Sequence, residues 1–98
     1  MKPRHLTTRD LKIIELYSHC QLAMTPQEFY AKWSVTQDMM AEICRRSKST
    51  VQHWFVEGSS RSSPKPMDLY HLALMDFLLE NFDKLSEELR IALCLHKH

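Results

Sequence analysis

The chain has 98 residues, which is enough for one hydrophobic core without disulfides or a structural metal and too few for two. Its single glycine, four prolines and 44% apolar residues exclude collagen-like and low-complexity chains. Three cysteines form no CxxC pair, no signal peptide is recognisable, and no apolar run approaches the roughly 20 residues of a membrane span. We therefore expect one cytoplasmic domain, residues 1–98, with reduced thiols and no membrane partner.

The formal net charge is +1, but the charge is distributed unevenly. Residues 1–44 are neutral, residues 45–66 carry +4 and residues 67–98 carry −3. A basic segment in a nearly neutral protein can hold an anionic polymer while the acidic end faces away from it. The alternative is an ordinary solvated surface, and charge alone does not separate the two.

Four capping signals divide the first half of the chain into short helices. The expected N-caps are Thr7, Thr25, Thr36 and Ser47. The first two belong to capping boxes, because an acidic residue follows each of them three positions later. Gly58 is expected to end the fourth helix. Residues 59–66, rich in serine and proline, are expected to form a loop.

Two expected helices carry wide apolar faces. The first helix gathers five residues in one arc: Ile13, Ile14, Leu16, Tyr17 and Cys20. A fifth helix should run from about residue 67 to 82, and ten of the fourteen residues 69–82 are apolar or aromatic. Only a narrow acidic stripe of Asp76, Glu80 and Asp83 interrupts it. We expect this helix to be buried on two sides, by its own domain or by a second copy.

A last helix should begin after Ser86, and no alternating strand pattern is present. The predicted fold class is therefore all-α, a compact bundle of five or six helices.

Residues 36–58 have an unusual spacing, with Ala41 ten positions before Val51 and thirteen before Trp54. Two short helices that cross closely need a small side chain on the first and an apolar stripe on the second. Val51, Trp54 and Phe55 form such a stripe at i, i+3 and i+4, so Trp54 is expected in the core. The opposite side of that helix then carries Ser49, Gln52, His53 and Val56.

This pattern resembles the helix-turn-helix family of DNA-binding proteins, most closely the phage-repressor-like bacterial regulators. The residues that carry the likeness are Gln37, Met40, Ala41, Ile43, Cys44, Ser47, Ser49, Thr50, Val51, Trp54 and Gly58, followed by Pro64 or Pro66, Leu72, Ala73 and Leu79. The resemblance covers residues 36–80 and implies a helix-turn-helix at residues 37–57. It places residues 48–56 in the major groove and residues 37–44 across the DNA backbone. It also implies a dimer, for which the C-terminal helices at residues 67–96 offer a surface.

The chain departs from the family at the turn. The family usually has glycine at the place of Arg45 and an apolar residue at the place of Arg46. A residue with a side chain forced into positive φ costs roughly 1 kcal/mol, so either that strain is tolerated or the turn follows another path. Both arginines are also candidates for phosphate contact.

The candidate DNA contacts fall into two classes. The expected base contacts are Lys48, Ser49, Thr50, Gln52, His53 and Val56. The expected phosphate contacts are Gln37, Arg45, Arg46, Arg61 and Lys65. Gln52 can pair with adenine N6 and N7, and a thymine methyl can pack on Val56. For each base contact the alternative is a solvated helix surface, and His53 can contact a base, contact a phosphate when protonated, or remain an exposed imidazole.

No motif for catalysis or metal binding accompanies these residues. A nucleophile elbow, a glycine-rich phosphate loop and a paired-carboxylate motif are all missing from the sequence, so we expect neither enzymatic activity nor a cofactor. Cys94, His96 and His98 alternate at the end of the chain, but residues at i and i+2 of a helix point apart. We therefore expect no metal site.

The sequence favours a sequence-specific regulator of transcription that binds double-stranded DNA as a homodimer and represses by occlusion. Three alternatives stay open. The first is a helical protein–protein interaction module that uses the apolar face of helix 67–82, the second a plasmid, phage or transposon accessory DNA-binding protein, and the third an activator. A monomer that hides the fifth helix internally is the alternative to the dimer.

Overall fold

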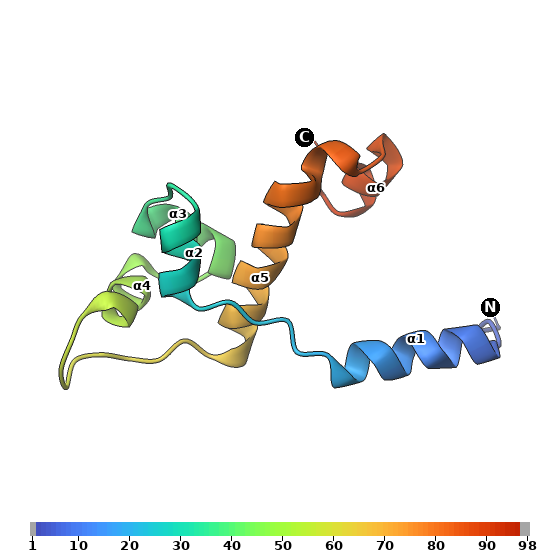
Figure 1. The fold of residues 1–98 in the computed structure, drawn as a ribbon, viewed down its shortest axis with the longest axis horizontal. Helices are drawn as coiled ribbons and strands as arrows, with labels where there is room; N and C mark the ends of the chain where they lie inside the picture. The colour runs from blue at the N-terminus through green and yellow to red at the C-terminus, as the bar shows by residue number, and fades with distance from the viewer. Residues whose placement is uncertain (1, 97–98) are drawn as a thin grey trace.

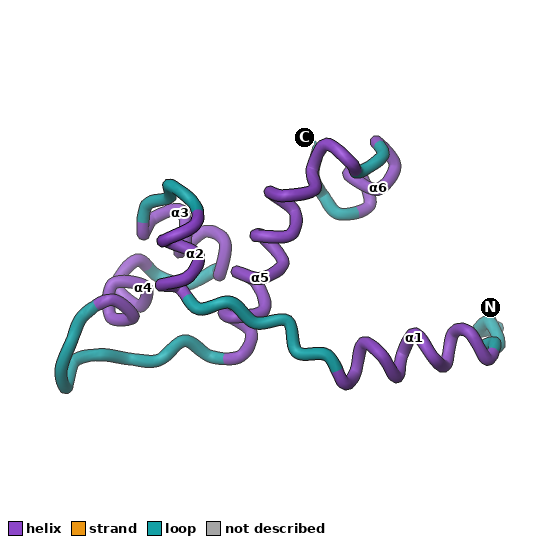
Figure 2. The backbone as a smooth tube through the Cα atoms, in the orientation of Figure 1, coloured by secondary structure: helices purple, strands orange, loops and turns teal. Residues whose placement is uncertain are grey.

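A computed structural model describes residues 2–96 and shows an all-α chain (Figure 1). The helices of this part are α1 (Thr8–His19), α2 (Pro26–Lys32), α3 (Gln37–Cys44), α4 (Lys48–Phe55), α5 (Pro66–Asn81) and α6 (Glu87–Ala92), with a 3-10 turn, η1 (Phe82–Lys84), between the last two. Helix and loop account for all of residues 2–96, with no strand (Figure 2). The predicted all-α fold class is confirmed.

Local hydrogen bonds start the helices where the sequence predicts. The Thr7 hydroxyl accepts from the amide of Asp10 at 3.1 Å, and the Asp10 carboxylate accepts from the amide of Thr7 at 2.9 Å. Thr25 and Glu28 form the same reciprocal pair, with both distances 3.0 Å. The hydrogen bond from the Thr25 amide lowers the pKa of Glu28. Single caps precede α3 and α4, as Thr36 and Ser47 accept the amides of the third residue along.

One hydrophobic core is shared by α2, α3, α4 and α5. Its buried apolar side chains are Phe29, Met40, Ala41, Cys44, Val51, Trp54 and Leu72. α3 packs against both α4 and α5, and α2 packs against α5 (Figure 1). The amide of Met24, just before α2, donates to the carbonyl of Leu69 in α5 at 3.1 Å, which joins the start of this unit to its last helix.

The acidic stripe of α5 is used to hold α2. The Lys32 ammonium lies 2.7 Å from the Asp76 carboxylate and 2.9 Å from that of Glu80. The indole N–H of Trp33 also donates to Asp76, at 2.9 Å. These contacts lower the pKa of Asp76, chiefly through the hydrogen bond from Lys32, and raise the pKa of Lys32.

α5 buries only one side in its own chain. Leu72 is fully buried, whereas Phe77, on the opposite side, is 54% exposed. The expectation that its own domain covers α5 on two sides is therefore wrong. The other half of that expectation, cover by a second copy, stays a prediction.

α1 lies outside the core unit and extends away from it (Figures 1 and 2). It contributes no buried residue. The apolar arc predicted for it faces solvent, with exposed fractions of 48% at Ile13 and 65% at Tyr17. α6 buries no residue either, and Arg90 attaches it to η1 by stacking 4.0 Å from the Phe82 ring centroid. The compact part of the fold is therefore α2–α5, within a molecule 51 Å long and 31 × 27 Å across.

Within residues 2–96, the helices fall short of the combined length and apolarity that a bilayer span requires.

Candidate nucleic-acid interface

α3 and α4 cross where the sequence places a small side chain. Ala41 is 8% exposed at this contact, and the α4 residues that face it, Val51 and Trp54, are 0% and 1% exposed. The predicted core positions of Val51 and Trp54 are confirmed. Because α4 is anchored along one side, its other side is left for solvent or a partner.

The turn between α3 and α4 is a Schellman motif with an arginine in the place of glycine. Arg45 has φ 56° and ψ 46°, in the left-handed region. Its amide donates to the carbonyl of Glu42 at 3.3 Å, and the amide of Arg46 donates to the carbonyl of Ala41 at 3.0 Å. Of the two outcomes left open by the sequence, the chain adopts the strained one.

Arg46 forms an ion pair that the sequence did not predict. Its Nε donates to Asp68 Oδ1 at 2.8 Å, and its Nη2 donates to Asp68 Oδ2 at 3.2 Å. Asp68 is 2% exposed, so its charge needs this partner. The same pair raises the pKa of Arg46. Arg46 therefore joins the turn to α5, and its contact with a phosphate stays a prediction.

Asp68 is a residue that the sequence analysis missed. Its Oδ2 also accepts the amide of Lys65 at 2.8 Å, which caps the start of α5. An acidic residue at the third helical position commonly accepts the N-cap amide, and Asp68 is the third residue of α5, after Pro66 and Met67. That local pattern could have located the cap, but nothing in it points to Arg46.

The outward side of α4 is polar and accessible. Ser49, Gln52 and His53 are all exposed, as the sequence predicts for a surface that faces a partner. Lys48 is exposed at the helix start, where its ammonium lies 3.4 Å from the Asp38 carboxylate. Thr50 is half-buried, and its hydroxyl is 3.0 Å from that of Ser47. Four of the predicted base contacts therefore share one exposed surface, with Thr50 at its edge.

Gly58 does not end α4, contrary to the prediction. The helix ends at Phe55, and Val56 follows in an extended conformation with 37% exposure. Gly58 has φ 89° and lies in the next turn, where its carbonyl accepts the amide of Arg61 at 3.1 Å. Val56, expected as the last residue of the recognition helix, is thus the cap residue after it.

Two distant groups close the C-terminal end of α4. The side-chain amide of Gln27 donates to the carbonyl of Trp54 at 2.9 Å. The amide of Ser62 donates to the carbonyl of His53 at 3.1 Å, which folds the loop back against the helix. Carbonyls at a helix end need such donors. These contacts join residues 27 and 9 positions apart, so no local signal predicts them.

The remaining phosphate candidates lie on α3, in the turn after it and in the loop between α4 and α5. Gln37 is the first residue of α3 and is half-buried, whereas Arg45, Arg61 and Lys65 are exposed. Within residues 2–96, these three cationic side chains form no ion pair. Their charges are therefore available to an anionic partner.

The described residues contain no group of three or more His, Cys, Asp or Glu side chains that could hold a metal ion. Cys44 is 5% exposed and belongs to the core. Its burial raises the pKa of the thiol to about 11. Of the alternating residues at the end of the chain, His98 lies outside the described part.

Comparison with protein-family models, with curated proteins and with solved structures found no match for this chain. Its function is therefore argued from the residues and contacts described above.

Proposed function

We propose that the chain is a cytoplasmic bacterial regulator that binds double-stranded DNA in a sequence-specific manner as a homodimer. In this proposal α3, the turn at Arg45 and α4 form a helix-turn-helix, and α4 enters the major groove. The observation that carries it is the two-sidedness of α4, whose Val51 and Trp54 are buried while Ser49, Gln52 and His53 are exposed.

The chemistry of the exposed side suits base edges. The Gln52 amide can donate to adenine N7 and accept from adenine N6, while the Ser49 hydroxyl can donate to or accept from either base of a pair. Lys48 and His53 can donate to guanine or to a phosphate. Thr50 and Val56, at the two ends of this surface, can pack against a thymine methyl.

Affinity in this proposal comes from phosphate contacts. Arg45, Arg61 and Lys65 supply positive charge from exposed positions, and Gln37 and the positive end of the α4 dipole add neutral donors. Binding should therefore weaken steeply with salt. Occupancy of the duplex would be sufficient for repression, and no catalytic step or cofactor is part of the proposal.

Selection from random duplexes, followed by salt titration of the selected site, tests this function. Gln52→Ala should reduce discrimination at one base position by about 1–3 kcal/mol, whereas Arg61→Ala should weaken all sequences alike and reduce the salt slope by about 1. Ser34→Ala, which also truncates a polar side chain but at an exposed position between α2 and α3, is the control and should do neither. Equal losses at every sequence from Gln52→Ala and Arg61→Ala would contradict the groove assignment.

The second candidate is a protein-interaction module without DNA. The exposed side of α5, with Phe77 54% and Met67 59% exposed, favours it. If the chain binds no duplex even at low salt, where electrostatic attraction is strongest, the DNA-binding proposal is wrong and the interaction module is the remaining candidate.

A further inference from the structure

We infer that two copies of this chain dimerise by exchanging α1, so that the apolar arc of each α1 lies on the exposed side of α5 in the other copy. This gives the proposed homodimer its interface, and it rests on the proposed function only for the expectation that a dimer forms.

α1 has the properties of a helix that needs a partner. It has 12 residues, and isolated helices of this length are marginal in water even with good sequences. Its capping box contributes about 1 kcal/mol, which does not replace tertiary contacts. Ile13, Ile14 and Leu16 are nevertheless 48%, 50% and 59% exposed on one arc. Within residues 2–96, the cover that the chain supplies leaves about half of each of these three side chains exposed.

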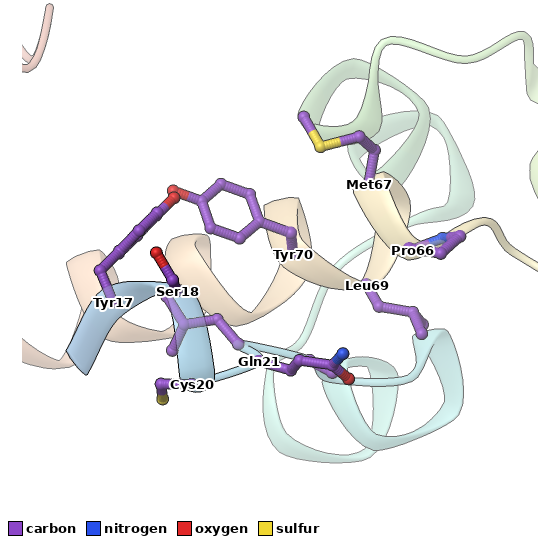
Figure 3. Close-up of a pocket in the computed structure, with 10 residues that line it drawn as sticks. Tyr17, Ser18, Cys20, Gln21, Pro66, Met67, Leu69 and Tyr70 are labelled. Atoms are coloured by element: carbon purple, nitrogen blue, oxygen red, sulfur yellow. The ribbon is translucent and has the colours of Figure 1, made fainter. Parts of the chain in front are cut away.

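The contacts at the end of α1 show where this helix diverges from the α2–α5 unit. The hydroxyl of Tyr17, near the end of α1, meets that of Tyr70 in α5, and this hydrogen bond raises the pKa of Tyr70 (Figure 3). The amide of Met24 is held by Leu69, so only residues 20–23 separate α1 from the core unit. From this crossing point, the turns that carry Ile13 and Leu16 run away from α5 (Figure 1). Their partner must therefore come from outside.

α5 offers a surface of matching kind. Tyr70, Leu74 and Phe77 lie at i, i+4 and i+7 on the side opposite Leu72, so they form one stripe. Two grooves border the stripe. The first, of about 680 Å³, is lined by Tyr17, Met67, Tyr70 and residues 20–23, and the second, of about 460 Å³, runs beside Phe77.

Charge favours the packing of α1 on α5 of the other copy over the packing of the two α1 helices on each other. Residues 2–19 carry four basic and two acidic side chains, so two copies of α1 repel each other. The groove beside Phe77 is lined by the carboxylates of Glu28, Asp76 and Glu80, and Lys32 pairs with the last two. Arg9 lies within the α1 arc, between Leu16 and Cys20 on the helical wheel, where it can reach those carboxylates.

The available area is sufficient for a stable dimer. Eight large apolar side chains of α1 and α5 are about half exposed in each copy. Their burial in a two-fold arrangement would remove roughly 1,500 Å², which is within the size range of specific, stable interfaces. An exchanged element also makes every contact twice, so the interface closes on two copies.

Sedimentation velocity of the full chain, without DNA, tests the inference. The wild-type chain should be a dimer at micromolar concentration. Ile13→Gln with Leu16→Gln should raise the dimer Kd by about a hundredfold or more, because each change is present twice. Lys12→Gln with Glu15→Gln is the matched control. It places two glutamines on the same helix outside the arc, removes no net charge and deletes only an exposed ion pair of 3.6 Å. Circular dichroism should show the α2–α5 unit folded in both.

Mixing two defective chains separates exchange from other dimers. A chain with Leu74→Gln and Phe77→Gln keeps its α1 arc, and the chain with Ile13→Gln and Leu16→Gln keeps its α5 stripe. Each should be monomeric alone, and together they should form a heterodimer with one intact α1–α5 contact. A monomeric wild type, a dimer insensitive to the α1 changes, or the absence of heterodimer on mixing would each overturn the inference.

The two proposals fail separately. A dimer that binds no duplex would refute the proposed function and leave the exchange intact. A monomer that selects a defined DNA sequence would refute the exchange and the homodimer, and would leave DNA recognition by α4 intact.

Discussion

The α2–α5 unit and α1 are built from similar proportions of apolar residues but end in opposite environments. Every buried apolar side chain in the described chain belongs to the unit, and α1 has none. The two regions differ less in local helix signals, since both begin with complete capping boxes. The difference shows that an apolar arc predicts a need for burial without showing which partner will meet it.

Polar contacts follow the same division. Within the unit, long-range hydrogen bonds join Gln27 to Trp54, Trp33 to Asp76 and Arg46 to Asp68. In α1, the side-chain hydrogen bonds to backbone are between neighbours in sequence, such as Ser18 to the carbonyl of Ile14 at 2.7 Å. The unit should therefore unfold cooperatively, and α1 should not share that transition.

Trp54→Ala is the strongest test of this difference. We expect it to lower the free energy of unfolding by about 3–5 kcal/mol, because a large cavity opens in the core. Leu16→Ala, on the exposed arc of α1, should change it by less than about 0.5 kcal/mol in dilute protein. Urea denaturation followed by far-UV circular dichroism measures both. A Trp54→Ala chain that kept wild-type stability would place Trp54 outside the core.

Asp68→Asn tests the polar half of the unit. The amide cannot compensate the Arg46 guanidinium or accept from it twice, and we expect a loss of about 2 kcal/mol. Arg46→Met should cost less after Asp68→Asn than before it, because the two side chains form one pair. Additive losses in this double-mutant cycle would show that the pair contributes no coupling. The readout is again urea denaturation.

Cys44 should make the unit sensitive to alkali. Its pKa is raised from 9.0 to about 11 in the folded chain, so between these values the unfolded chain releases a proton that the folded chain keeps. Stability is then unaffected below pH 9 and falls as the pH rises towards 11, by about 1 kcal/mol between pH 8 and pH 10. Cys44→Ala should lack this part of the pH dependence, which isolates it from lysine and tyrosine titration.

Arg45→Gly should have the smallest effect on folding and the opposite sign. Relief of the left-handed strain should stabilise the unit by about 0.5–1 kcal/mol. If Arg45 contacts a phosphate as proposed, the same change should reduce the salt slope of DNA binding by about 1. Arg45→Ala removes the charge without relieving the strain, so it should weaken binding and leave the chain no more stable. Stabilisation by both variants would contradict the strain.

The sequence predicted what depends on neighbouring residues. Thr7, Thr25, Thr36 and Ser47 cap the helices expected of them, because a capping hydrogen bond spans three residues. The crossing of α3 and α4 was also predictable, since the spacing from Ala41 to Val51 and Trp54 fixes which sides can meet. The helical periodicity also predicted correctly that Ser49, Gln52 and His53 are exposed.

What the sequence did not predict depends on contacts between distant residues. Arg46 looks like a free cation until Asp68, 22 positions later, is brought beside it by the packing of α3 on α5. Glycine commonly follows the end of a helix, so Gly58 was expected to end α4. The helix ends earlier, at Phe55, where Gln27 and the loop supply donors for its last carbonyls. The open side of α5 could not be predicted either, because periodicity gives the width of an apolar face and not its neighbours.

The bond between Arg46 and Asp68 has a consequence for protein engineering. The Asp68 carboxylate holds the turn that orients α4 and also caps the start of α5. Residues 37–55 therefore depend on α5 for their arrangement and cannot be transferred alone. A chimaera that transplants this segment onto another scaffold would have to bring the acid of α5 with it. Without Asp68, the guanidinium of Arg46 in the turn between α3 and α4 would have no ion-pair partner, and the transplanted helix would lose its orientation.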